Sequence, residues 1–198
     1  MILIAAGFFA AGSTPSDDAP VSQIVAFYTA HDAAQVASGV LLSLGALFFL
    51  VFCAALASAL WRSSAARLWL VVCFGGGLLF VVGITIAAGL AVFIGNLADG
   101  LDPAALQALH VANLLVVFPW TVGASAFLLG AAAAVLRSEP LPAWLGWMAL
   151  VLGIVAAVPS HVLGGALYHI GVVPIAGLGI WTVVVSVLLA RRGETLTA

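Results

Sequence analysis

Long apolar runs separated by short polar breaks make up most of this chain. The runs do not alternate between apolar and polar residues, as the strands of a membrane barrel would. Each run approaches or exceeds the ~20 residues with which a helix crosses about 30 Å of hydrocarbon. We therefore expect an all-α fold, a polytopic transmembrane helical bundle whose five full spans cover residues 36–60, 68–95, 104–136, 142–162 and 168–190.

The chain opens with a shorter apolar segment, residues 1–12. At the rise of an α-helix this segment is about 18 Å long, which is too short to span the hydrocarbon. Three interpretations stay open: a partial, truncated first spanning helix, a signal peptide cleaved near the sequence AAGS, and a half-inserted anchor.

An outer loop of residues 13–35 follows, and it starts with the turn-rich, acidic stretch STPSDDAP. Behind that stretch, apolar side chains recur at helical spacing, at Val21, Ile24, Val25 and Tyr28. This spacing predicts a short amphipathic helix that lies in the membrane interface. Residues 1–198 then form a single transmembrane domain, with 191–198 as a cytoplasmic tail.

Proline and glycine mark the expected irregularities of the helices. Asp102 followed by Pro103 predicts a helix start, because a carboxylate caps the first turn and proline fits the first helical position. Pro119 predicts a kink in its span, and Pro174 predicts an interruption of the last span. Close contacts between helices are expected at the glycines of the run 75–77 and at Gly123 and Gly130.

Charge is sparse, since 6% of the residues are charged and 65% are hydrophobic. A soluble domain carries about 25% charged residues, so this composition cannot cover a surface that faces water. The chain contains no lysine and no basic patch, and we therefore expect no nucleic acid as a partner.

The basic residues give the expected orientation in the membrane. All five are arginines, and each lies beside a span on the same side of the expected bundle. Because basic residues mark the cytoplasmic side, we expect a multi-pass membrane protein with a cytoplasmic C-terminus. A chain without lysine and rich in alanine, glycine and valine is typical of a GC-rich bacterial genome, so we expect this membrane to be the bacterial cytoplasmic membrane. The orientation anchors are Arg62, Arg67, Arg137, Arg191 and Arg192. The aspartates all fall in the opposite, outer loops: Asp17, Asp18, Asp32, Asp99 and Asp102.

Three stretches carry a resemblance to a known group of proteins: PSDDAPVSQIVAFYTAH, LDPAALQALHVANLLVVFPW and RSEPLPAWLGWMALVLG. Through them the chain resembles bacterial, actinobacterial-type integral membrane proteins with six helices, which are grouped as a domain of unknown function. The resemblance covers nearly the whole chain. It implies six spanning helices, which supports a truncated first helix within residues 1–12, and it implies no activity.

Candidate chemistry is concentrated in the histidines, all of which fall on the outer side. Counting about 20 residues from each arginine turn puts His110 one turn outside the hydrocarbon, and His161 and His169 at its boundary. Imidazoles bind transition metals and haem iron, so one alternative predicts His110, His161 and His169 as metal ligands. The other explanation is that histidine is amphipathic and suits an interface. Further polar groups of the outer face are His31, Asp99 and Asn113.

The spans contain no Asp, Glu, Lys or Arg at membrane depth, the groups on which ion-coupled transport depends. No nucleophile motif occurs, and we assign no catalytic residue. The leading hypothesis is a non-enzymatic protein without a cofactor, which interacts with membrane lipid, with a membrane protein partner or with its own copies. The alternatives are a protein that binds a transition metal or haem through the outer histidines, and a facilitator for a neutral or apolar small molecule.

Overall fold

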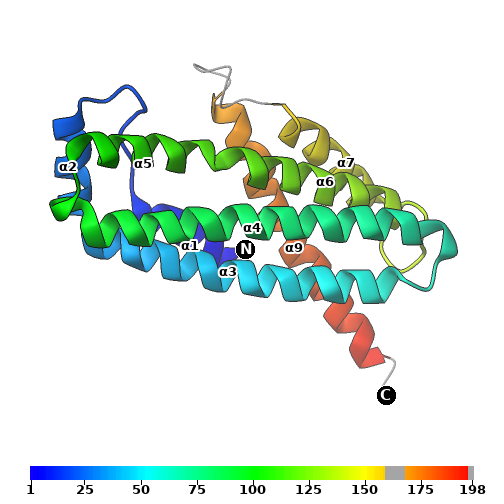
Figure 1. Ribbon diagram of the computed structural model, residues 1–198. Helices are drawn as coiled ribbons and strands as arrows, with labels where there is room; N and C mark the ends of the chain where they lie inside the picture. Colours follow the sequence, from blue (N-terminus) through cyan, green and yellow to red (C-terminus); the bar gives the residue numbers. More distant parts are fainter. Residues whose placement is uncertain (159–167, 196–198) are drawn as a thin grey trace. The chain divides into compact units, whose positions relative to one another are not determined.

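The computed structural model describes residues 1–158 and 168–195, and the side chains of 168–172 and 192–195 lie outside that description. The described residues form helices joined by short turns and, between α1 and α2, by the longer loop of residues 12–20 (Figure 1). In chain order the elements are α1 (Ile2–Ala11), α2 (Val21–Ala30), α3 (Asp32–Leu60), η1 (Ser64–Ala66), α4 (Arg67–Leu97), η2 (Ala98–Gly100), α5 (Pro103–Leu115), α6 (Val117–Val135), α7 (Ala143–Ala156) and α9 (Tyr168–Thr195). The two η elements are 3-10 helices of three residues each.

The expectation of an all-α fold is confirmed, since the described residues contain helices and turns and no strand. Among them, four helical stretches are long and apolar enough to cross a membrane: Asp32–Leu60, Ser64–Gly100, Pro103–Val135 and Val173–Arg191. The expected number of five full spans is not confirmed. The span predicted at 142–162 corresponds to α7, which has 14 residues, and residues 159–162 lie outside the described ranges.

Proline affects two of the predicted spans in different ways. The helix expected over 104–136 is divided, because α5 ends at Leu115 and α6 begins at Val117. Pro119 has no N–H to donate to the carbonyl of Leu115, and the helix breaks at that turn. The interruption predicted at Pro174 is wrong, since α9 runs through this residue. Pro174 lies in the second turn of α9, where the helix loses one hydrogen bond and continues, as spanning helices tolerate.

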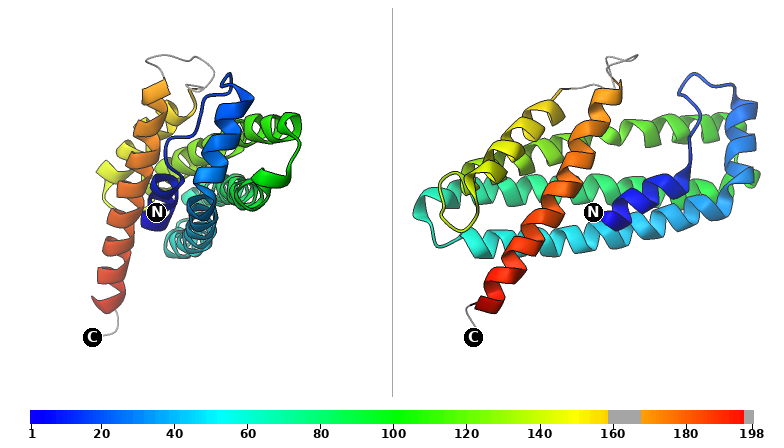
Figure 2. Two further views of the ribbon diagram at one scale, coloured as in Figure 1. Left: turned by 90° about the vertical axis from the view of Figure 1, so that its left-hand side faces the viewer. Right: turned by 180° about the vertical axis from the view of Figure 1, so that it is seen from behind.

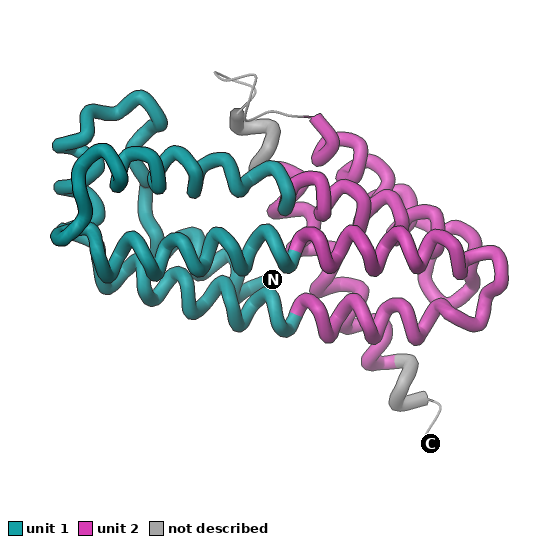
Figure 3. The backbone as a smooth tube through the Cα atoms, in the orientation of Figure 1, with its two compact units in different colours: residues 1–48, 81–120 teal, residues 49–80, 121–198 magenta. Residues whose placement is uncertain are grey.

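The chain divides into two compact units, and Figure 3 shows them in different colours. Unit 1 comprises residues 1–48 and 81–120, and unit 2 comprises residues 49–80 and 121–198. Helices α3 and α4 each contribute one part to unit 1 and one part to unit 2.

In unit 1 the short helix α1 packs against α3 through glycine. A Cβ atom on Gly45 would lie 2.5 Å from the Cγ1 of Ile4 and 2.9 Å from its backbone nitrogen. A Cβ atom on Gly7 would lie 2.8 Å from the Cγ of Leu42. Ile4 itself is fully buried. Helix α1 and the middle of α3 therefore approach each other closely within unit 1.

In unit 2 the core is a cluster of aromatic rings. Phe49 lies 5.0 Å from Phe80 and 5.1 Å from Phe127, measured between ring centroids, and Trp181 lies 5.9 Å from Phe127. The indole N–H of Trp181 donates a 2.9 Å hydrogen bond to the carbonyl of Leu145, so its polar atom is satisfied in the apolar core. These contacts join α3, α4, α6, α7 and α9.

The turns that carry arginine meet at one end of unit 2. The hydroxyl of Ser63, in the turn after α3, donates a 2.9 Å hydrogen bond to the carbonyl of Arg137, in the turn after α6. The guanidinium carbon of Arg137 lies 5.1 Å from the ring centroid of Trp69, within the range of a cation–π contact. We call these two turns, residues 61–66 and 136–142, the arginine end.

The outer faces of the long helices are apolar. Leu47, Phe48 and Val51 of α3 are each more than half exposed, as are Leu68 and Val71 of α4. Exposed apolar area costs about 25 cal/mol per Å² in water, and lipid removes this cost. The long helices are therefore suited by length, composition and surface to a membrane.

Candidate functional site

The candidate site is the end of unit 1 at which α2 crosses the C-terminal end of α4 and the start of α5 (Figures 1 and 2). Apolar residues of α2 hold it there. Ile24 and Tyr28, one helical turn apart, are fully buried against Ile94 near the end of α4, Ala98 of η2 and Leu106 of α5. The predicted amphipathic helix at residues 21–30 thus packs with its apolar face against protein.

A series of hydrogen bonds through buried side chains also holds helix α2 in place. The Tyr28 hydroxyl and Nδ1 of His110 lie 2.9 Å apart, and both residues are fully buried. On the other side of the imidazole, Nε2 lies 3.4 Å from the carbonyl oxygen of Ser16, in the loop before α2. The imidazole of α5 therefore connects to α2 and to the preceding loop at once.

The chemistry of the hydrogen-bond partners determines which ring nitrogen of His110 carries the proton. A carbonyl only accepts, so Nε2 of His110 carries the proton and donates to Ser16, and Nδ1 accepts from the hydroxyl of Tyr28. The side chain of Asn113 hydrogen-bonds the phenol oxygen of Tyr28. The Tyr28 hydroxyl and Nε2 of His110 then donate in the same direction, from α2 through the imidazole to Ser16, an arrangement in which each hydrogen bond strengthens the next. Among the described residues, Oδ1 of Asn113 is buried without a hydrogen-bond partner.

Aspartates lie at the surface of unit 1 near these buried hydrogen bonds. Asp99, in η2, accepts a 2.8 Å hydrogen bond from the hydroxyl of Thr29 on α2. Asp102 caps α5 by accepting from the backbone N–H of Ala104 at 2.9 Å, as predicted from the Asp-Pro sequence. With Asp17, Asp18 and Asp32 they make up all the aspartates of the chain, and unit 1 contains no Glu, Lys or Arg. We call this part of unit 1 the acidic end.

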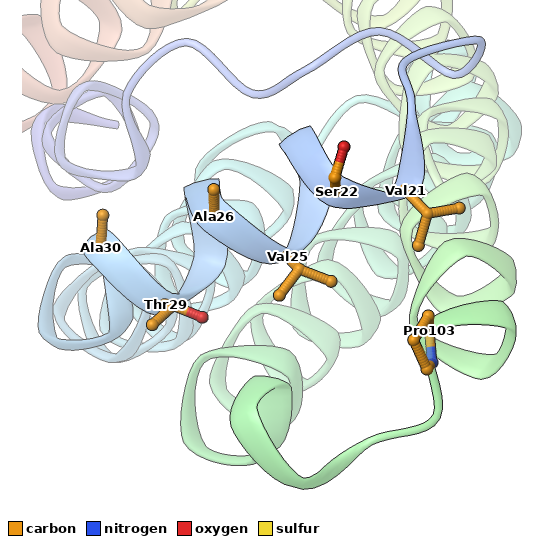
Figure 4. Close-up of a pocket in the computed structure, with 7 residues that line it drawn as sticks. All are labelled: Val21, Ser22, Val25, Ala26, Thr29, Ala30 and Pro103. Atoms are coloured by element: carbon orange, nitrogen blue, oxygen red, sulfur yellow. The ribbon is translucent and has the colours of Figure 1, made fainter.

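An open groove runs along the outer side of α2 (Figure 4). It measures about 590 Å³ and is lined by small or apolar side chains: Val21, Ser22, Val25, Ala26, Thr29, Ala30 and Pro103. Thr29 also hydrogen-bonds Asp99, and Pro103 follows Asp102, so the groove borders two carboxylates.

The structure separates the polar residues expected at the outer face. It brings His110 and Asn113 together around Tyr28, whereas Asp99 lies at the surface beside Thr29. His31 is exposed and follows the last residue of α2, and its Nδ1 lies 2.8 Å from the carbonyl oxygen of Phe27. Both ring nitrogens of His110 thus have hydrogen-bond partners within the protein, and the imidazole of His31 is not one of them.

The predicted metal site falls largely outside the described part of the chain. His161 lies in the range 159–167, and the side chain of His169 is likewise not described. Within the described residues, no group of three or more His, Cys, Asp or Glu side chains is arranged to hold a metal ion. The metal or haem alternative therefore stays a prediction.

Comparison with protein-family models, with curated proteins and with solved structures gives no match for this chain. The resemblance to bacterial six-helix membrane proteins accordingly stays an expectation from the sequence.

Tyr28 is the central residue of the site, and its role was not predicted. The sequence placed it on the apolar face of a short helix. The signal that could have found it is its hydroxyl, because a buried phenol needs a hydrogen-bond partner. Nothing in the sequence identifies that partner, since His110 follows 82 residues later.

We expect Tyr28 to make the protein sensitive to alkaline pH. Burial raises the pKa of the Tyr28 phenol above its usual value of about 10, and the hydrogen bond from Asn113 opposes this in part. The unfolded chain ionises first, so the stabilisation is complete below about pH 10 and is lost as pH rises through the raised pKa. Above about pH 10 the unfolding midpoint should therefore fall faster for the wild type than for Tyr28→Phe.

Phenolate absorbance gives an independent measurement, because the chain has only two tyrosines, Tyr28 and Tyr168. In a Tyr168→Phe variant the absorbance reports Tyr28 alone, and it should appear only at a pH above that of free tyrosine. Ionisation of Tyr28 at the pH of free tyrosine, in a protein that is still folded, would contradict its burial.

Proposed function

We propose that this chain is a multi-pass protein of the bacterial cytoplasmic membrane with a non-enzymatic role, which presents α2 on the outer surface to a partner. The observation that carries the proposal is the division of charge. The aspartates belong to unit 1, whereas all five arginines belong to unit 2.

Helix α4 supports an orientation across the membrane. It begins at Arg67, ends at Leu97 and is followed by Asp99. A helix of 31 residues is about 46 Å long, which exceeds the ~30 Å of the hydrocarbon core. By the preference of basic residues for the cytoplasm, the arginine end is cytoplasmic in our proposal, and so is the C-terminus after Arg191 and Arg192. The acidic end then faces outward.

The buried chain Tyr28–His110–Ser16 supports a binding role over catalysis. Both nitrogens of the imidazole are engaged in holding α2 and its loop, so His110 would have to break these contacts to bind a metal. The facilitator alternative gains no support either. The hydroxyls of Ser43, Thr85, Thr182 and Ser186 bond to carbonyls of their own helices, as satisfied packing residues do.

Reporter fusions test the proposed orientation. Fusions after Ser64 and after Ser138 should both report the cytoplasm, with active green fluorescent protein and inactive alkaline phosphatase. A fusion after Asp99 should report the opposite side. The Ser64 and Ser138 fusions serve as a matched pair, because the structure joins their turns through Ser63 and Arg137. Opposite results for that pair, or the same side for all three, would refute the orientation.

A further inference from the structure

We propose that the groove on the outer side of α2 is a docking site for a basic amphipathic helix of a partner polypeptide. The inference rests on the proposed function, since it needs the acidic end to face the outside. It specifies the chemistry of the partner from the shape of the groove and from the charges around it.

The groove is preformed because α2 is held from behind. Ile24 and Tyr28 are fully buried, and Tyr28 is hydrogen-bonded to His110. The opposite face of the helix, with Ser22, Ala26 and Ala30, is exposed. A face that is already ordered loses little conformational entropy on binding.

The shape of the groove favours a helix over a small molecule. Ser22, Ala26 and Ala30 are each one helical turn apart, and such small side chains let a second helix approach closely. They follow about 12 Å of helix axis. The groove has a volume within the range of ligand pockets, but most of its lining residues are exposed, so it cannot enclose a compact ligand.

The charge around the groove determines the sign of the charge that a partner must carry. Asp99 and Asp102 adjoin the groove through Thr29 and Pro103 and are exposed. Unit 1 has no Lys or Arg side chain to neutralise them. Anionic lipid headgroups and acidic peptides are therefore repelled. A helix with a small apolar face flanked by arginine or lysine satisfies both the groove and the carboxylates.

The test uses full-length protein in nanodiscs of zwitterionic phosphatidylcholine. The probe is a fluorophore-labelled helical peptide of about 14 residues, or about 21 Å, with an alanine and leucine face flanked by arginines. Fluorescence anisotropy should show saturable binding above that of empty nanodiscs, and the affinity should fall as salt screens the charges. The same peptide with glutamate in place of arginine should not bind.

Matched variants separate the groove from general attraction to the nanodisc. Ala26→Leu fills the groove and should weaken binding at least about tenfold, whereas Gln23→Leu, on the same helix but outside the lining, should change it less than about twofold. Asp99→Asn with Asp102→Asn keeps the acceptor for Thr29 and a good helix cap and should also weaken binding about tenfold.

Three outcomes would overturn the proposal: binding equal to that of empty nanodiscs, equal binding by the glutamate peptide, or equal binding by Ala26→Leu and the wild type. Competition by a simple alkylammonium ion as effective as the peptide would also overturn it, since a small cation would then be sufficient. The reporter fusions are independent of the peptide. A correct orientation without peptide binding refutes the docking site alone, whereas an inward-facing Asp99 refutes the proposed function.

Discussion

Gly123→Leu should prevent folding of the protein, because no side chain fits between α4 and α6 at this position. A Cβ atom on Gly123 would overlap the backbone nitrogen of Phe80 and lie 2.8 Å from the carbonyl carbon of Leu79. These are backbone atoms of α4, which cannot rotate away as a side chain can. Overpacking of a core costs about 1–3 kcal/mol where side chains can adjust, and here two helices must separate.

Two further glycines belong to the same contact. A Cβ atom on Gly76 would overlap the backbone nitrogen of Phe127, and one on Gly130 would lie 2.5 Å from the backbone nitrogen of Cys73. Gly123→Ala, Gly76→Ala and Gly130→Ala should therefore each lower the stability of the folded state by at least about 2 kcal/mol. The folded fraction as a function of SDS mole fraction measures this stability for a helical membrane protein.

Gly75→Ala is the matched control, since a Cβ atom on Gly75 meets nothing within 4 Å. Alanine favours helix over glycine by about 1 kcal/mol, so this variant should be as stable as the wild type or slightly more stable. Equal stability of Gly75→Ala and Gly76→Ala, or a well-folded Gly123→Leu protein, would contradict the close packing of α4 and α6.

These glycines also show how far the sequence predicts the fold. The run 75–77 and the pair Gly123 and Gly130 predicted helix–helix contacts, and the structure places Gly76, Gly77, Gly123 and Gly130 in such contacts. It leaves Gly75 open. The sequence shows where small residues gather, but the rotation of each helix about its axis decides which of three adjacent glycines faces a neighbour.

The long apolar helices were predictable for a similar reason. A run that can cross hydrocarbon is a local property of the chain, and α3 and α4 match the predicted spans within four residues at each end. The count of five spans needed more than local information. The span predicted over 142–162 was placed by counting apolar residues. Helix α7 ends at Ala156, and residues 159–162 lie outside the described ranges.

The candidate site was predicted only in part, because its contacts join distant segments. Asp102 capping α5 is local, and the sequence identified it correctly. The bond between Tyr28 and His110 joins residues 82 positions apart, and the sequence assigned His110 to a different hypothesis, metal binding. An apolar pattern predicts which face of α2 is buried, but it contains no information on which side chain of α5 that face meets.

His110→Ala should release α2 from the end of unit 1. The substitution removes the acceptor of the Tyr28 hydroxyl and the donor to the Ser16 carbonyl, and it leaves a cavity at a fully buried position. A buried phenol without a partner costs about 1–3 kcal/mol, and the cavity adds to this cost. Amide hydrogen exchange in residues 21–30 should rise at least about tenfold, while exchange in α6 and α7 should stay unchanged.

A double-mutant cycle distinguishes this chain of hydrogen bonds from general damage. Tyr28→Phe removes only the hydroxyl and should cost about 1 kcal/mol. In the Tyr28→Phe background, His110→Ala should lower the free energy of unfolding by about 1 kcal/mol less than it does in the wild type. The control His31→Ala changes an exposed imidazole that does not belong to these hydrogen bonds. It should leave amide hydrogen exchange in α2 nearly unchanged.

His110→Gln tests the role of the imidazole itself. A glutamine amide can accept from the Tyr28 hydroxyl and donate to the Ser16 carbonyl, so this variant should restore much of the protection in α2. Glutamine is a poor substitute for a histidine that binds a transition metal. If His110 were instead a metal ligand, Gln should behave as Ala does, and addition of zinc to the wild type should increase the protection of α2. Rescue by glutamine without an effect of zinc identifies His110 as the residue that holds α2 in place.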